Sequence, residues 1–392
     1  MKSGAGLNYK YDDNIRVSAV DPLALGGVTL DGFVDGRYAT QRMEAMAYLK
    51  LGVERYDHVS VSEDNPLLIE PTASDFDNES YDLNGSVSYS WELHSVSMFA
   101  RSARDSTLNT QFQDTGLGGL REIEGSSPRD TVSVRPSWRW QLTERQQMDT
   151  SIDWQTVDYE NSRYVDYDYV AAVVGWSYLL SEQMQLQIQP RVSRFENEAN
   201  ISVKSKTLGL QGGFIWSINE KWKLDLLAGG TRVHTEYGSG GYFVFNPETG
   251  QIEFIEIEDQ DNNGFTGDLS LNFSEEYYGF VAKMSSGVSP SGNGVLRYNN
   301  RAQLTFYWNP RERMRVDIDA IVGQNDSTDD RVSNKRDFSE AALRIGYQFA
   351  ENWWASARYR YRTNETERSI SGAGSSNLLS ATLSYKLPKE IL

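Results

Sequence analysis

This chain of 392 residues contains no cysteine and only three histidines, His58, His94 and His234. Without cysteine, disulfides and thiolate metal sites are excluded, and three dispersed histidines do not support a histidine-rich metal centre. We therefore expect neither a metal nor a cofactor. Long hydrophobic runs are missing too: the mean hydropathy is −0.56. No segment approaches the roughly 20 consecutive apolar residues of a transmembrane helix.

Instead, the chain shows alternation of apolar and polar residues with a period of two. Leu269, Leu271 and Phe273 stand between polar neighbours, and Val316 and Ile318 repeat the pattern. Such alternation gives a β-strand one apolar and one polar face. The eighteen predicted strands span residues 4–12, 27–39, 44–56, 80–91, 94–104, 129–141, 146–158, 166–180, 183–195, 201–217, 221–235, 264–274, 277–287, 294–308, 312–323, 337–349, 353–364 and 376–387.

Short turns and long polar loops alternate between these segments. The short turns, such as Gln41-Arg42 and Asn309-Pro310, follow every second strand and therefore fall at one end. This rhythm is typical of a transmembrane antiparallel up-and-down β-barrel with periplasmic turns and extracellular loops. We predict a single, monomeric all-β barrel over residues 1–392 in the bacterial outer membrane, with eighteen strands, or sixteen as the alternative. The sequence opens almost directly in a strand, so we expect a mature chain whose signal peptide has been removed.

Aromatic residues make up 12% of the chain, and many tryptophans lie beside the short turns. Indole rings prefer the headgroup boundary of a bilayer, so these tryptophans predict an aromatic belt at the periplasmic side. The predicted belt contains Trp91, Trp140, Trp216, Trp222, Trp308, Trp353 and Trp354. Strand phase directs Leu304 and Leu343 outward to lipid.

The opposite face of the strands, toward the predicted lumen, is rich in charge. Its arginines are Arg135, Arg139, Arg297, Arg301, Arg315, Arg344, Arg358, Arg360 and Arg362, and its acids are Asp149, Asp153, Asp317, Asp319 and Glu340. One interpretation is a network of ion pairs that braces the wall. The other is a basic track for anionic sugar units, because arginine binds carboxylates through two parallel hydrogen bonds. Both can hold at once.

The longest predicted loop, at about residues 236–263, carries a hairpin pattern of its own. Apolar runs at residues 242–245 and 252–255 flank a turn-rich segment at residues 246–250. The hairpin either stands above the rim or folds inward to constrict the pore. The constricting side chains would then be Tyr242, Phe243, Phe245 and Phe254.

The net charge of −17 is concentrated in the long loops. It argues against non-specific nucleic-acid binding, which needs a basic outer surface. Acidic loops would also suit divalent cations near a lipopolysaccharide-rich surface. No serine or second histidine stands at a spacing that would build a hydrolase site with His234, so we expect no catalytic residues and no enzyme.

Residues 6–15, Gly-Leu-Asn-Tyr-Lys-Tyr-Asp-Asp-Asn-Ile, resemble the start of the β-barrel porins found with exopolysaccharide biosynthesis genes. Residues 377–387 are similar to the C-terminal insertion signal of outer-membrane barrels, although residues 388–392 replace the usual terminal aromatic. The resemblance implies passive export of a secreted polysaccharide, an exopolysaccharide or capsule chain. It also implies partners: outer-membrane lipid and lipopolysaccharide, the polysaccharide chain, and periplasmic or inner-membrane polysaccharide-synthesis proteins. Composition and periodicity alone leave open an uptake porin for small sugars or organic acids, or a structural scaffold that anchors or encloses a partner protein.

Overall fold

A computed structural model describes residues 2–15, 17, 22–61, 72–106, 127–160, 164–199, 202–238, 241–246, 251–256, 258–292, 294–328, 335–366 and 373–387. No helix within these ranges is long and apolar enough to cross a membrane. One short 3-10 helix, η1 (Ala73–Phe76), follows the third strand. Eighteen strands form a single sheet, and two more form a separate hairpin.

The strands of the large sheet alternate in direction along the chain. They are β1 (Lys2–Asp12), β2 (Leu23–Ala39), β3 (Met43–Val61), β4 (Asn78–Trp91), β5 (His94–Ser106), β6 (Pro128–Thr143), β7 (Gln146–Tyr159), β8 (Tyr167–Ser181), β9 (Met184–Asn197), β10 (Val203–Ser217), β11 (Trp222–Tyr237), β14 (Gln260–Ser274), β15 (Tyr278–Pro290), β16 (Leu296–Arg311), β17 (Met314–Ser327), β18 (Arg336–Ala350), β19 (Trp353–Thr366) and β20 (Gly374–Lys386). The separate hairpin consists of β12 (Gly241–Asn246) and β13 (Gln251–Glu256).

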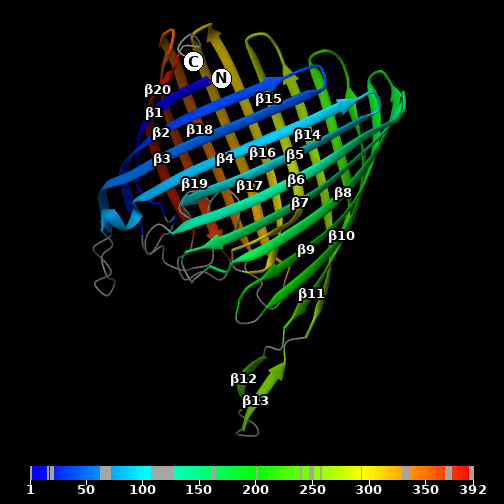
Figure 1. The fold of residues 1–392 in the computed structure, drawn as a ribbon. Helices are drawn as coiled ribbons and strands as arrows, with labels where there is room; N and C mark the ends of the chain where they lie inside the picture. The colour runs from blue at the N-terminus through cyan, green and yellow to red at the C-terminus, as the bar shows by residue number, and fades with distance from the viewer. Residues whose placement is uncertain are drawn as a thin grey trace.

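The large sheet closes on itself because its first and last strands pair. β1 and β20 are antiparallel, in a register that runs from Gly4 opposite Lys386 to Asp12 opposite Leu378. β11 pairs with β14, so the hairpin of β12 and β13 is an excursion from the wall. Closure leaves no unpaired strand edge in lipid. Figure 1 shows the tilted strands around this ring, with both termini at the end that carries the short turns. The structure confirms the antiparallel up-and-down barrel and its eighteen strands.

Each predicted strand is present, and the largest differences lie at the long-loop ends. β2 begins at Leu23 where we predicted residue 27, and β3 ends at Val61 where we predicted residue 56. β14 begins at Gln260, four residues before the predicted start. Beyond the bilayer both faces of a strand can meet water, so the strand ladder continues after the apolar–polar alternation has ended.

Aromatic rings gather outside the barrel near the short turns. The ring of His94 stacks on those of Trp138 and Trp140, at centroid distances of 5.9 and 5.7 Å. Trp353 packs on Tyr385 at 4.8 Å. An apolar band with an aromatic girdle is the outer surface of a barrel in a bilayer. The predicted belt thus forms, with one correction: Trp354, next to Trp353 in the strand, turns to the other face, over Gly346.

The wall bends sharply where β10 and β11 meet at glycines. A Cβ on Gly213 would lie 1.7 Å from the carbonyl oxygen of Leu226. A Cβ on Gly229 would lie 1.8 Å from the carbonyl oxygen of Leu210. Only glycine fits such a close backbone approach, which is typical of a barrel corner. Inside this corner Gln211 of β10 and Asp268 of β14 line the same cavity.

Candidate functional site

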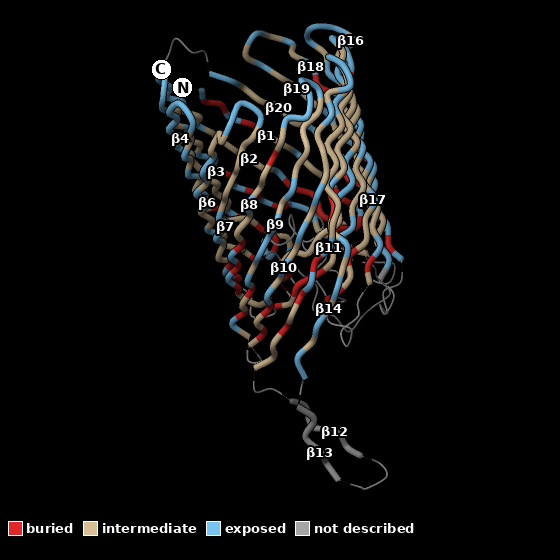
Figure 2. Tube along the Cα trace, turned by 90° about the vertical axis from the view of Figure 1, so that its right-hand side faces the viewer, coloured by how far each residue is buried: buried red, intermediate tan, exposed pale blue. Residues whose placement is uncertain are grey.

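Buried residues concentrate in the long-loop half of the barrel (Figure 2). One cluster lies at the long-loop ends of β7, β8, β9, β11 and β16, and consists of Val157, Tyr159, Tyr167, Tyr169, Ala171, Phe195, Val233 and Leu296. The β15–β16 connection reaches this region: the Asn197 amide donates to the Gly294 carbonyl at 2.7 Å, and the Val165 amide to the Gly292 carbonyl at 2.9 Å. Because β10, β11 and β14 separate β9 from β15 along the wall, these contacts cut across the mouth.

The described part of the β1–β2 connection also folds inward. Ile15 belongs to a second buried cluster, with Leu23, Leu25, Tyr56 and Phe76. The amide of Val17 donates to the Asn14 carbonyl at 2.9 Å, and the Asn14 side chain donates to the Ser375 carbonyl at 2.8 Å. Val17 is only 2% exposed and has a φ of 50°. We call the described residues Asn14, Ile15 and Val17 the inner turn.

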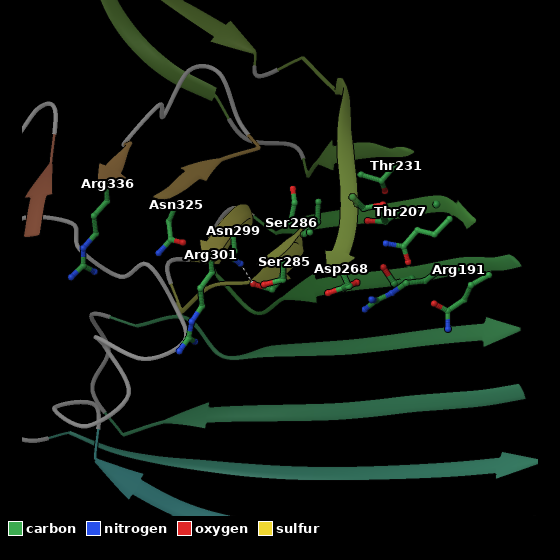
Figure 3. Close-up of a pocket in the computed structure, with 18 of the residues that line it drawn as sticks. Arg191, Thr207, Thr231, Asp268, Ser285, Ser286, Asn299, Arg301, Asn325 and Arg336 are labelled. Carbon is green, nitrogen blue, oxygen red and sulfur yellow. Dashed lines mark hydrogen bonds between the residues drawn. The ribbon is translucent and has the colours of Figure 1, made fainter. Parts of the chain in front are cut away.

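A polar cavity of about 330 Å³ lies in the lumen beside the corner (Figure 3). Its lining comes from β9 to β11 and β14 to β18, and includes Arg191, Asp268, Asn299, Arg301 and Arg336. Arg191 donates to the Tyr169 hydroxyl at 2.8 Å. In Figure 3 the labelled side chains of Arg301 and Arg336 lie on one side of the cavity and that of Arg191 on the other. This part of the lumen is thus lined by hydrogen-bonding groups suited to hydrophilic solutes.

A second cavity, of about 520 Å³, is lined from both walls of the barrel. We call it the basic chamber. Val17 of the inner turn also lines it, and Arg301, Arg336 and Phe338 border both cavities. Its charged lining consists of six arginines, Arg101, Arg129, Arg301, Arg336, Arg358 and Arg362, and three acids, Asp105, Asp319 and Glu340. The chamber therefore attracts anions.

The predicted lumen arginines fall into two groups with different surroundings. On β6, Arg135 contacts Asp153 of β7 at 2.6 Å and Arg139 contacts Asp149 at 2.7 Å. In this group each arginine contacts an acid of the neighbouring strand, as the interpretation of a bracing ion-pair network expects. The other group occupies β16 to β19, on the wall that bears Arg297, Arg301, Arg315, Arg344, Arg358, Arg360 and Arg362.

On that second wall, which we call the arginine wall, the described ion pairs differ in length. Arg315 holds Asp317 at 2.7 Å, but Arg358 is 3.4 Å from Glu340. Asp319 accepts the Thr305 hydroxyl at 2.7 Å. Sequence reasoning placed these residues on one face, and the structure brings them together around the basic chamber and below it.

Two neighbouring arginines of this wall face each other directly. Arg344 of β18 is the register partner of Arg358 of β19, and like charges directly opposite in a sheet are destabilising. Beside them, the Nε of Arg360 is buried without a hydrogen-bond acceptor among the described residues, and its register partners are Ala342 and Leu378. A sequence keeps adjacent like charges and a buried donor without an acceptor at a cost, which is typical of functional surfaces.

The outer end of the arginine wall is more tightly packed. Arg297, 3% exposed, and Arg336, 4% exposed, lie at the long-loop ends of β16 and β18. Arg362 contacts Asp12 of β1 at 2.5 Å, and the Ser376 hydroxyl donates to Asp12 at 2.6 Å. Sequence reasoning missed Arg336 and Arg129 as lumen residues. The missed signal was strand phase, which puts Arg336 on the same face as Glu340.

The hairpin of β12 and β13 confirms the strand pattern read in the longest loop. The two strands pair antiparallel, from Gly241 opposite Glu256 to Asn246 opposite Gln251. Figure 1 draws this ribbon beyond the long-loop end of the barrel, as in the first of the two alternatives. The side chains of Tyr242, Phe243, Phe245 and Phe254 lie outside the described residues, so their role as a constriction stays a prediction.

Comparison with known proteins identifies no relative by sequence. No family model matches the chain, and no curated protein matches it. Among solved structures, the chain is similar to the copper transporter OprC, with 7% identity, a TM-score of 0.48, and coverage of 98% of this chain and 82% of the other. It is also similar to OccAB3 of Acinetobacter baumannii (12%, TM-score 0.44, covering 98% and 99%) and to OpdK of Pseudomonas aeruginosa, solved with vanillate (10%, TM-score 0.45, covering 98% and 98%).

Identities and TM-scores this low carry no argument about function, and the properties of this chain follow from its own strands and side chains. A closed antiparallel barrel satisfies all backbone groups of its membrane-spanning strands internally, which lipid demands. Leu304 and Leu343 are exposed on its outside, above a girdle of aromatic rings. The protein is an outer-membrane β-barrel with a polar lumen.

Proposed function

We propose that this protein is an outer-membrane pore that passively exports an anionic polysaccharide chain. The observation that carries the proposal is the distribution of arginines along the height of one wall. Arg297 is in register with Ser327, twelve residues above Arg315 on β17. At a rise of about 3.3 Å per residue, the arginine wall extends over ~40 Å along the strand.

Arginines spread along the height of the wall suit a polysaccharide chain better than a single small molecule. A site for one small solute gathers its donors around one point. Donors spread along the axis let a polymer exchange one weak contact for the next, and none holds it long enough to stall. Arg344 and Arg358 face each other across β18 and β19, and their guanidiniums can donate hydrogen bonds to a passing carboxylate.

Transport in this proposal follows a gradient and includes no covalent step. Among the residues that the structure describes, no group of three or more acidic, histidine or cysteine side chains could hold a metal ion. Polysaccharide-synthesis proteins of the periplasm or inner membrane would deliver the chain at the end with the short turns, where both termini lie (Figure 1).

Uptake of small anionic solutes is a second candidate, and the sizes of the lumen cavities favour it. The described lumen contains cavities of about 330 and 520 Å³, each the size of a site for a small organic molecule. The two candidates share an anion-attracting lumen and differ in what passes through it.

Charge reversal of the arginine wall tests the proposal. We expect the triple variant Arg344→Glu, Arg358→Glu, Arg360→Glu to shift ion selectivity in planar bilayers toward cations and to lower the uronate released by polymer-producing cells. Its barrel should still migrate as a folded species on unboiled gels. Unchanged secretion with slower swelling of liposomes in small organic anions would favour the uptake candidate. A lowered unfolding temperature with unaltered selectivity would contradict both, because the arginines would then only brace the wall.

A further inference from the structure

We infer that the basic chamber is a discrete binding site for one carboxylate group, at a constriction made by the inner turn. The inference deepens the proposed function and rests on it for the carrier of the carboxylate, a hydrophilic anionic solute. The shared chemistry covers a uronate unit of a polymer and a free organic acid.

A residue of the inner turn lines the chamber inside the barrel. Barrels of 16–18 strands otherwise leave an aqueous channel. Here Val17 lines the same cavity as Arg101 and Arg129 of one wall and Arg301 and Arg358 of the other. The inner turn is fixed there by the backbone bond between Val17 and Asn14. It therefore narrows the lumen beside the arginines.

Val17 also adopts a backbone conformation that valine avoids. Its φ of 50° lies in the left-handed region, where a β-branched side chain is strained. Such strain persists where the surroundings fix the residue, and it clusters at ligand-contacting sites. Val17 is buried and lines the chamber, so its strained backbone lies at the proposed site.

The arginines of the two walls differ in how fully their donors are used. Arg129 holds Asp105 through two bonds of 3.0 Å. Arg101 holds Asp82 in the same bidentate way, at 3.1 and 2.9 Å. These two guanidiniums are already paired with carboxylates, so they shape the chamber and do not compete for its ligand.

On the opposite wall, two guanidiniums have donors to spare. Arg301 donates to the Gln303 amide oxygen at 3.3 Å, and its buried Nε has no acceptor within the described part of the chain. The bond from Arg358 to Glu340 is 3.4 Å long. Charge-assisted bonds of this kind are normally 2.7–2.9 Å. A carboxylate between Arg301 and Arg358 would supply the acceptors that the chain itself does not, and its planar geometry matches the guanidinium fork.

The charge balance of the lining also fits a small anion. Three of the six lining arginines are paired with acids: Arg129 with Asp105, Arg101 with Asp82 and Arg362 with Asp12. The other three lining arginines face two acids, Asp319 and Glu340. The remaining positive charge suits a group with one negative charge, attracts it from either end of the lumen, and leaves uncharged sugars without this gain.

The test is block of single-channel current by a probe of matched shape. D-glucuronate and D-glucose share a ring and differ in one carboxylate. We expect glucuronate, added to the purified full-length barrel in planar bilayers, to cause brief blocks that glucose does not cause. The double variant Arg301→Gln, Arg358→Gln should weaken this block by about tenfold or more. The matched control, Arg135→Gln with Arg139→Gln, removes two lumen arginines that already have acid partners and should keep it.

Each other outcome overturns a defined part of the inference. The carboxylate site is refuted if glucose blocks the current as strongly as glucuronate, or if both double variants lose the glucuronate block equally. It is also refuted if the wild type is anion-selective but glucuronate does not block it. None of these results contradicts the proposed pore. A wild type without anion selectivity would instead refute the proposed function. Val17→Gly, which the positive φ tolerates, should raise conductance and shorten the blocks. Unchanged conductance would remove the inner turn from the constriction. Folding of every variant is checked on unboiled gels.

Discussion

Replacing Leu304 by arginine tests which face of the barrel wall contacts lipid. The structure allows the loss in free energy of unfolding to be worked out. Leu304 is 46% exposed on the outer face of β16, between Ala282 and Ala320 of the neighbouring strands, which offer no acceptor for a guanidinium. Trp308 lies on the same face, four residues toward the short turns. This spacing is ~13 Å along the strand and ~10 Å along the membrane normal at a tilt of ~40°.

The apolar band of such barrels is about 25 Å tall, so a residue ~10 Å above the aromatic belt lies near its midplane. Arginine at this depth costs about 2–4 kcal/mol, which corresponds to a fall of ~30-fold to ~900-fold in the folding equilibrium. Gln303, the preceding residue, lines the basic chamber on the lumen side. Gln303→Arg introduces the same side chain into a polar environment, and we expect it to cost less than ~1 kcal/mol.

Guanidinium titrations of the refolded barrel in lipid vesicles, followed by tryptophan fluorescence, measure both free energies of unfolding. The predicted difference between the two variants is at least ~1 kcal/mol. Equal costs for Leu304→Arg and Gln303→Arg would refute the assignment of lipid and lumen faces, and with it the arginine wall.

Three further predictions concern the corner, the hairpin and a turn. Gly229→Val should cost ~3 kcal/mol or more and reduce the yield of folded barrel on unboiled gels, whereas Gly230→Val, whose Cβ would meet nothing closer than 3.8 Å, should fold; equal yields would contradict the close approach of β10 and β11. Deleting residues 242–257 should leave single-channel conductance nearly unchanged, because the hairpin ribbon extends away from the barrel; a several-fold rise would instead place the hairpin inside the pore. The hydrogen bond and charge of Glu275 raise the pKa of Lys221 in the folded barrel. This exposed pair therefore stabilises the barrel fully at a pH below the unfolded-state pKa of about 10.4. The stabilisation is lost as the pH rises through the pKa of Lys221 in the folded barrel. Melting temperatures of wild type and Lys221→Gln should therefore differ slightly at about pH 8 and converge at about pH 12, and a gap that widened with pH would contradict this.

The strands of the barrel wall could be predicted because the pattern that specifies them lies in neighbouring residues of the sequence. A period of two fixes which face each side chain takes, and lipid on one side with water on the other makes that period visible in residues such as Leu304 and Gln303. Arg135 and Asp153 could be placed on one face in the same way. Their contact was then a matter of register between adjacent strands, which short turns restrict to few choices.

The interior could not be predicted in this way because it depends on contacts between distant residues. Asn197 and Gly294 are 97 residues apart, and no periodicity links them. Nothing in the sequence around Val17 distinguishes a connection that folds into the lumen from one that points to solvent. The interpretation of the arginines likewise depended on which of them meet acids, and the structure answers this differently for β6 and for β16 to β19.

The network of Asp12, Arg362 and Ser376 joins the two ends of the sheet, across separations of 350 and 364 residues. It forms when β1 and β20 become neighbours, which closes the sheet. Until then each of these two strands exposes an unpaired edge, and such edges capture foreign strands. The assembling chain must therefore be shielded along both strands until the barrel closes, and burial of Asp12 marks that closure.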